Sequence, residues 1–218
     1  MAKASVSKRR QEGGDETAVR ERILEAAFAA FMKSGYATTS MLEIATRARV
    51  SKRELYALVG NKQEMLIACI SKRAKRLDVP ADLPVLRDRE TLARLLVSFG
   101  TKLVREVSDP TVIAVFRLAI GEAVQAPEVA RALDSIGRET GRAALRKIMA
   151  EAQSSGLLTG RPAELGEQFA GLLWRDLMVS LLLGVAERPN PREIARRVRD
   201  AAAAFLQLHR LPNDGEWK

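Results

Sequence analysis

Apolar residues recur at helical spacing along almost the whole chain, from Val19 to Leu208, and no stretch keeps the period-two alternation of a strand. The chain has 218 residues, of which 47% are hydrophobic and 29% charged, so it is long and apolar enough to bury a core. We therefore expect an all-α globular protein.

Turn residues and helix caps divide this pattern into elements. Gly35 is expected to end the first helix, Ser51 to cap a short one, and prolines to open four later ones. The expected helices span residues 17–33, 40–47, 51–58, 62–77, 88–108, 110–125, 127–154, 162–185 and 191–208. Two prolines within 79–84 mark a boundary. The sequence thus predicts a flexible basic arm (1–16), a domain of short helices (17–77) and a domain of longer helices (78–218).

Residues that perform catalysis or bind metals are scarce. The chain has one cysteine, Cys69, and one histidine, His209, which excludes an internal disulfide and a Cys/His zinc cluster. An all-α enzyme is the alternative from another class, but the sequence lacks a Glu-x-x-His motif and a nucleophile with a base. We expect no enzymatic activity, no metal and no cofactor.

No segment of the sequence predicts export or membrane insertion. The basic N-terminus is not followed by the apolar run of a signal peptide. The most apolar stretch, residues 172–186, contains Arg175 and Asp176 and is shorter than the roughly 20 residues that a spanning helix needs. We expect a cytoplasmic protein without a membrane partner.

Positive charge is concentrated at the start of the chain. Residues 1–76 contain 16 basic and 8 acidic side chains, whereas the rest contains 20 and 19, so nearly all of the net charge of +9 lies in the first third. A basic domain joined to a nearly neutral one indicates that the first binds a polyanion. The alternative is a basic face kept for solubility.

Residues 41–58 fit the packing pattern of a helix-turn-helix. Counting from Met41, two helices that cross steeply need apolar contacts at the fourth, eighth, tenth, fifteenth and eighteenth positions and a small residue at the fifth. These positions hold Ile44, Ala48, Val50, Leu55, Leu58 and Ala45. The remaining positions of the second helix include Lys52, Arg53, Glu54 and Tyr56, which form a polar face suited to the major groove.

These residues, with their flanks, resemble the TetR family of bacterial one-component transcriptional regulators. The resemblance covers residues 17–77 and rests on Phe31, Gly35-Tyr36, Thr38-Thr39-Ser40, Ile44-Ala45, Val50-Ser51, Leu55-Tyr56, Asn61-Lys62 and Met65-Leu66. Residues 116–122, Phe-Arg-Leu-Ala-Ile-Gly-Glu, followed by Pro127-Glu128, resemble an AefR-like variant of the C-terminal domain. The resemblance implies an N-terminal three-helix DNA-binding domain and a C-terminal helical domain for effector binding and dimerisation.

The family's docking mode assigns roles to the polar residues. The expected DNA-binding residues are Thr39, Ser40, Ser51, Lys52, Arg53, Glu54, Tyr56 and Lys62. Hydroxyl and ammonium groups near helix N-termini suit phosphate contacts, while Lys52 and Arg53 suit base reading and Glu54 can accept from a cytosine amino group. Lys8, Arg9 and Arg10 could follow the minor groove. The alternative for all of these residues is a solvated face.

Two departures from the family pattern bear on function. Arg49 occupies a turn position where the family usually has Gly, and a left-handed conformation there costs a non-Gly residue about 1 kcal/mol. Arg53 and Glu54 replace residues that tend to be small, so we expect an operator that differs from those of better-matched relatives.

The second domain is expected to hold the dimer surface and an effector cavity. The resemblance implies that 162–185 and 191–208 pair with their symmetry mates, and their wide apolar faces are consistent with this. The expected dimer interface is Phe169, Leu173, Leu177, Leu181, Ile194, Val198 and Phe205. The expected pocket residues are Phe99, Leu103, Phe116, Arg117, Ile120, Leu145, Met149 and Trp174. For both sets the alternative is monomer core.

The resemblance to the TetR family implies a dimeric repressor that a small, largely apolar effector releases from a palindromic operator. The residues themselves indicate a basic DNA-binding domain and a separate helical domain. An activator, or a regulator that responds only to a partner protein, is the remaining alternative.

Overall fold

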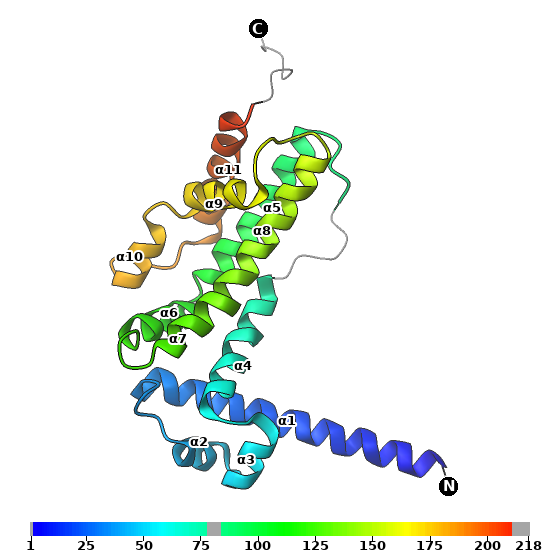
Figure 1. Ribbon diagram of the computed structural model, residues 1–218, viewed down its shortest axis with the longest axis vertical. Helices are drawn as coiled ribbons and strands as arrows, with labels where there is room; N and C mark the ends of the chain where they lie inside the picture. The colour runs from blue at the N-terminus through cyan, green and yellow to red at the C-terminus, as the bar shows by residue number, and fades with distance from the viewer. Residues whose placement is uncertain (1, 78–83, 211–218) are drawn as a thin grey trace. The chain divides into compact units, whose positions relative to one another are not determined.

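The computed structural model describes residues 2–77 and 84–210, and every regular element in these ranges is helical (Figure 1). The α-helices are α1 (Ala2–Ser34), α2 (Met41–Ala48), α3 (Lys52–Val59), α4 (Lys62–Ala74), α5 (Arg89–Val107), α6 (Pro110–Gly121), α7 (Pro127–Ala132), α8 (Glu139–Ser154), α9 (Pro162–Trp174), α10 (Leu177–Leu183) and α11 (Pro191–Leu208). A 3₁₀ turn, η1 (Lys75–Leu77), follows α4, and a π-helical turn, η2 (Leu133–Arg138), joins α7 to α8. The expected all-α fold is confirmed.

The described chain divides into two compact units. Unit 1 contains the described residues up to Arg73 together with Val115–Ile136, and unit 2 contains Ala74–Ala114 and the described residues from Gly137 onward. The sequence placed 115–136 in the second domain, but Val115 and Val129 are buried in the same cluster as Phe31 of α1. Most of the proline-containing segment 79–84, the expected boundary, lies outside the described residues.

Local sequence signals explain most helix boundaries. Pro110, Pro127, Pro162 and Pro191 each open a helix as expected, because the fixed φ of proline suits the first turn and its missing N–H is not needed there. Gly35 follows α1 and has φ +85°, a backbone conformation that residues with a Cβ rarely adopt.

The first helix begins earlier than the sequence indicated. It starts at Ala2 rather than at Thr17, so the structure continues a helix through the segment expected to be a flexible arm. Residues 2–16 contain no proline and are rich in Ala, Lys, Arg, Gln and Glu, which favour helix. The side chains of residues 1–14, with Lys8, Arg9 and Arg10, lie outside the described part of the structure.

The helix expected over 162–185 is broken into α9 and α10 at Arg175, whose backbone has φ 44° and ψ −124°. Arg197 Nη1 donates to the carbonyl oxygens of Leu173 at 3.1 Å and Trp174 at 3.2 Å. These bonds satisfy carbonyls at the end of α9 that lose their helical N–H partners where the helix breaks.

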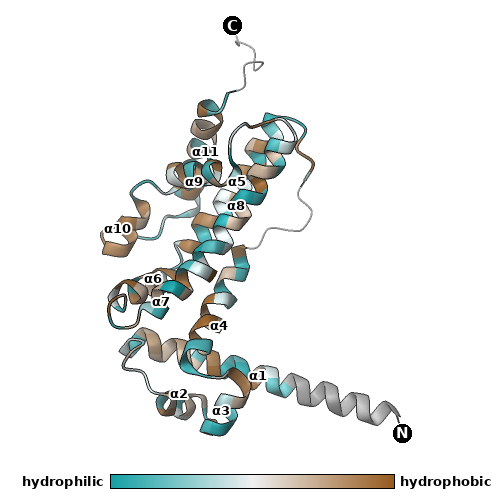
Figure 2. Ribbon diagram, in the orientation of Figure 1, coloured by the Kyte–Doolittle hydropathy of each residue, from teal (hydrophilic) through white to brown (hydrophobic). Residues whose placement is uncertain are grey.

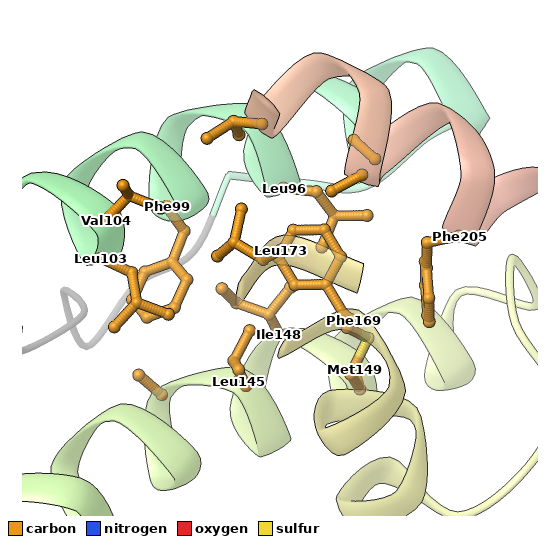
Figure 3. Close-up of a cluster of buried hydrophobic side chains, with 14 of the residues drawn as sticks. Leu96, Phe99, Leu103, Val104, Leu145, Ile148, Met149, Phe169, Leu173 and Phe205 are labelled. Atoms are coloured by element: carbon orange, nitrogen blue, oxygen red, sulfur yellow. The ribbon is translucent and has the colours of Figure 1, made fainter. Parts of the chain in front are cut away.

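Unit 2 is built around side chains from α5, α8, α9 and α11. Figure 2 shows hydrophobic and hydrophilic residues interspersed along α5 and α8, as expected for helices with one buried face. In the core, Phe169 and Phe205 meet edge to face with ring centroids 5.6 Å apart (Figure 3). Within the described ranges, none of the helices is sufficiently long and apolar to cross a membrane.

Candidate nucleic-acid interface

The two helices α2 and α3 pack against α1 and against each other through the residues that the spacing predicted. Ile44, Ala48 and Leu55 are completely buried, Ala45 is 2% exposed, and Val50 and Leu58 are partly buried against the same cluster. The small side chain of Ala45 allows the backbones to approach at the crossing. The structure therefore forms the helix-turn-helix that was expected.

The turn between α2 and α3 has the left-handed conformation that the Arg49 position suggested. Arg49 has φ 54° and ψ 50°, its N–H donates to Thr46 O at 3.2 Å, and the N–H of Val50 donates to Ala45 O at 3.1 Å. This bonding pattern is a Schellman motif, which usually has Gly at the left-handed position. The turn therefore places a non-Gly residue in a strained conformation.

Arg22 connects the turn to α1. Its Nε donates to the carbonyl oxygen of Ala48 at 2.8 Å, across 26 positions of sequence. Sequence reasoning missed this contact, because an arginine on the polar side of an expected helix carries no signal of its partner.

The outward face of α3 carries the side chains that were expected to read DNA. Lys52, Arg53 and Glu54 are exposed, Tyr56 is 50% exposed, and Leu55 between them is buried. A guanidinium or ammonium group on such a face can donate to base edges, and the phenol can donate to a phosphate. The arrangement allows α3 to enter a major groove without disturbing the core below it.

Two serines cap the helices of this motif. The Oγ atoms of Ser40 and Ser51 accept from the backbone N–H groups of Glu43 and Glu54, each at 3.1 Å, at the N-termini of α2 and α3. A hydroxyl that accepts from its own helix still has its hydrogen to donate, and a helix N-terminus attracts anions. Both exposed serines are therefore suited to phosphate contacts.

The structure gives Thr39 a different task from the predicted phosphate contact. Thr39 is 2% exposed, and its hydroxyl donates to the carbonyl oxygen of Gly35 at 2.6 Å. A buried hydroxyl whose hydrogen is already committed cannot reach a phosphate oxygen. Thr39 instead stabilises the loop of residues 35–39, which leads from α1 to α2.

Lys62 holds the same loop. Its Nζ donates to the carbonyl oxygens of Tyr36 at 2.8 Å, Ala37 at 3.1 Å and Thr39 at 3.1 Å, and lies 4.6 Å from the centroid of the Tyr36 ring. An ammonium group has three hydrogens, and these three bonds use them all. In this geometry Lys62 positions the loop and has no donor left for the predicted phosphate contact.

Tyr36 is the buried centre of the loop. It is 4% exposed and its ring packs against Phe31 at a centroid distance of 5.3 Å. Burial raises the pKa of its phenol, and the carboxylates of Glu128 and Glu122 raise it further. Both carboxylates belong to the segment 115–136, so this segment contributes to the electrostatics of the loop.

The residues predicted to line an effector pocket do not belong to one unit. Phe99, Leu103, Leu145 and Met149 are buried in the core of unit 2 (Figure 3), and Trp174 packs against that core. The other three, Phe116, Arg117 and Ile120, lie on α6 in unit 1, where Ile120 is 62% exposed. Periodicity identified apolar positions but not the unit against which each helix packs.

The residues predicted for the dimer face are also corrected. Phe169, Leu173, Leu177, Leu181, Ile194, Val198 and Phe205 are all at most 7% exposed in the single chain. They form monomer core, which was the alternative interpretation, because these faces of α9, α10 and α11 already pack within unit 2. Exposed apolar side chains are found elsewhere on α10 and just after it, at Val179, Leu183 and Val185.

Unit 2 also has a polar surface pocket of about 330 Å³. It is lined by Arg175, Leu177, Glu187, Pro189, Glu193, Arg196, Arg197 and Asp200. None of the eight predicted pocket residues belongs to this lining. Among the residues that the structure describes, no three His, Cys, Asp or Glu side chains are grouped so as to hold a metal ion.

Comparison with known proteins gives two family matches. Residues 23–69 match the family described as bacterial regulatory proteins, tetR family. Residues 94–210, more than half of the chain, match the C-terminal domain of AefR-like transcriptional repressors. Both matches coincide with the resemblance seen in the sequence.

Individual relatives agree with these families. The chain is 39% identical over 71 residues to the HTH-type transcriptional repressor SCO4008 of Streptomyces coelicolor, a match that spans 33% of this chain and 36% of that protein. It is 25% identical over 196 residues to the repressor KstR of Mycolicibacterium smegmatis, which covers 88% and 89% of the two chains. The solved structure of the flavonoid-responsive regulator FrrA, 25% identical, superimposes with a TM-score of 0.75 over 90% of this chain and 99% of that one.

The helix-turn-helix, the exposed cationic face of α3 and the two family matches lead to one identification. This chain belongs to the TetR family of bacterial transcriptional regulators, with an AefR-like C-terminal domain, and is a DNA-binding regulator rather than an enzyme.

Proposed function

We propose that this protein is a transcriptional repressor that binds a palindromic operator as a homodimer in the cytoplasm and is released by a small, largely apolar effector. The observation that carries the proposal is the outward face of α3, where Lys52, Arg53 and Tyr56 are exposed above the buried Leu55. Ser40 and Ser51 fix the register of the motif on the phosphates, and Lys52 and Arg53 read the bases.

The need for two copies follows from the size of the reading head. An eight-residue recognition helix makes too few contacts for tight specific binding, so helix-turn-helix proteins generally place two copies on two half-sites. Val179 and Leu183 on α10 are 58% and 70% exposed, and Val185 just after it is 76% exposed. Figure 2 shows α10 as predominantly hydrophobic. We assign the dimer contact to this exposed side of α10, because burial against a second copy would remove its apolar surface from water.

The choice of effector rests on chemistry and on one relative. The core of unit 2, with Phe99, Leu145 and Phe169, is apolar and aromatic, so an effector that binds by displacing part of this packing would have to be apolar as well. FrrA is named as flavonoid-responsive, which supports a planar aromatic effector for the present chain. Release requires that the effector bind better to a conformation with low operator affinity than to the DNA-bound one.

Selection from a random-sequence duplex library, followed by footprinting and a salt series, tests the DNA-binding part. We expect a palindrome whose half-sites are protected together and a steep loss of affinity with salt. The same duplex then serves to screen planar aromatic compounds, with a flavonoid as the first probe. Enrichment of a single, unpaired half-site would contradict the dimeric model, and unchanged DNA binding across the aromatic panel would contradict the effector class.

The substitution Leu183→Asp tests the dimer contact, and Val124→Asp is its matched control. Val124 is an exposed apolar residue of unit 1, at 93% exposure, outside the proposed contact. We expect Leu183→Asp to produce a monomer in light-scattering measurements and to reduce the salt slope on the palindrome by about half. Val124→Asp should remain dimeric. A dimeric Leu183→Asp variant would place the interface elsewhere.

A further inference from the structure

The loop of residues 35–39 is held from two sides by side chains of opposite charge. Lys62 Nζ donates hydrogen bonds to three carbonyl oxygens of the loop, and the N–H of Ala37 donates to Glu122 Oε1 at 3.2 Å. Glu122 lies 85 positions away, just after the end of α6, in the segment of unit 1 that separates the two parts of unit 2 in sequence. Nothing in the sequence pattern of the helix-turn-helix points to this contact.

The carboxylate of Glu122 fits closely against the loop. A Cβ placed on Gly35 would lie 2.9 Å from Glu122 Oε1, so the absence of a side chain at Gly35 allows the close approach. Glu122 is itself held, because its carbonyl oxygen accepts from the N–H of Ala126 at 2.7 Å. Its main chain is therefore part of an ordered turn.

We propose that Glu122 is a positioning residue for DNA binding, which holds the α1–α2 loop so that Ser40 presents the N-terminus of α2 to a phosphate. Ser40 directly follows this loop and caps α2, so a displacement of Ala37 is transmitted over three residues to the cap. The role of Ser40 at the phosphate rests on the proposed function. The contact between Glu122 and Ala37 does not.

The expected effect has a sign that electrostatics alone would not produce. Removing a negative charge from a unit that binds a polyanion should strengthen DNA binding. If Glu122 positions the loop, its removal should weaken binding instead. A hydrogen bond to a charged acceptor shifts a local equilibrium by about tenfold or more. Only the loop-ordered fraction binds with full affinity, so the loss of affinity is smaller than this shift, and we expect Glu122→Ala to weaken binding several-fold.

Three variants of the full-length chain test the proposal on the duplex selected with the wild-type protein. We expect Glu122→Ala to bind several-fold more weakly and Glu122→Gln to bind within about twofold of wild type, because the amide oxygen can still accept from Ala37. Glu25→Ala, which removes the same charge from an exposed position on α1, should bind as tightly as wild type or more tightly. Wild-type affinity in Glu122→Ala, or a Glu122→Gln variant as weak as Glu122→Ala, would overturn the proposal.

A second readout needs no DNA. Hydrogen exchange of the Ala37 amide, followed by NMR, should be faster in Glu122→Ala than in wild type and near the wild-type rate in Glu122→Gln. An unchanged Ala37 rate in Glu122→Ala would overturn the assignment of the contact, even where DNA binding falls. Failure of the proposed function would be distinguishable, since the wild-type protein would then select no duplex while the exchange pattern persisted.

Discussion

Replacing Arg49 by glycine should stabilise the protein. The residue has φ 54° and ψ 50°, a conformation that costs a side chain with a Cβ about 1–2 kcal/mol relative to glycine. Glycine loses more backbone freedom on folding, which offsets about 0.4–1 kcal/mol of this gain. We expect the free energy of unfolding to rise by about 0.5–1 kcal/mol, or Tm by about 1–4 °C for a chain of this size.

Arg49→Ala is the matched control, because it removes the same guanidinium but keeps the Cβ. Arg49 is exposed, so this variant should stay within about 0.5 kcal/mol of wild type in urea unfolding. Both variants lose the same charge, so any effect of that charge on DNA affinity is common to them. The difference between their free energies of unfolding therefore reports the backbone strain at residue 49. If Arg49→Gly is no more stable than Arg49→Ala, the strain assigned to this turn is absent.

Three further outcomes follow from the site and the core. Ser51→Asp should retain the helix cap and Tm but weaken DNA binding at least tenfold, because the carboxylate repels a phosphate. Ser51→Ala should instead lower the free energy of unfolding by about 1 kcal/mol through loss of the cap. Equal DNA affinity in Ser51→Asp and wild type would contradict the phosphate contact. Lys62→Ala should weaken DNA binding yet leave the salt slope unchanged, because its ammonium bonds the loop, and a slope reduced by about one would restore a direct phosphate contact. Burial raises the pKa of the Cys69 thiol to about 11, so at pH 8 about one molecule in a thousand carries the thiolate. An aromatic disulfide reagent should therefore label Cys69 only after unfolding. Rapid labelling of the folded protein would contradict this expectation.

The parts of the site that the sequence predicted correctly are those set by local chemistry. Ser40 and Ser51 were expected next to helix N-termini, and a cap needs only a hydroxyl and a backbone N–H three residues on. The left-handed turn at Arg49 was also expected, because the family that the sequence resembles usually has Gly at this position. Such contacts span a few residues and leave a pattern in the sequence.

The misassigned roles depend on partners that only the folded chain brings together. Lys62 was expected at a phosphate because it is a cation near a helix N-terminus, but the carbonyls of Tyr36, Ala37 and Thr39 lie within reach of its ammonium. Likewise, a wide apolar face on a helix predicts burial and not the identity of what buries it. Phe169 and Phe205 show the consequence, since they pack on each other within one chain rather than across a dimer.

The placement of residues 115–136 gives the protein a covalent route between its two units. The chain passes from unit 2 to unit 1 after Ala114 and returns after Ile136, and between these points Val129 is buried with the helix-turn-helix core while Glu122 bonds the α1–α2 loop. If the proposed effector shifts the chain at these two crossings, the shift would be transmitted through a segment that is anchored to the α1–α2 loop. Under the proposed function, an effector that perturbs unit 2 would change operator affinity by displacing the Glu122 contact, without touching α3.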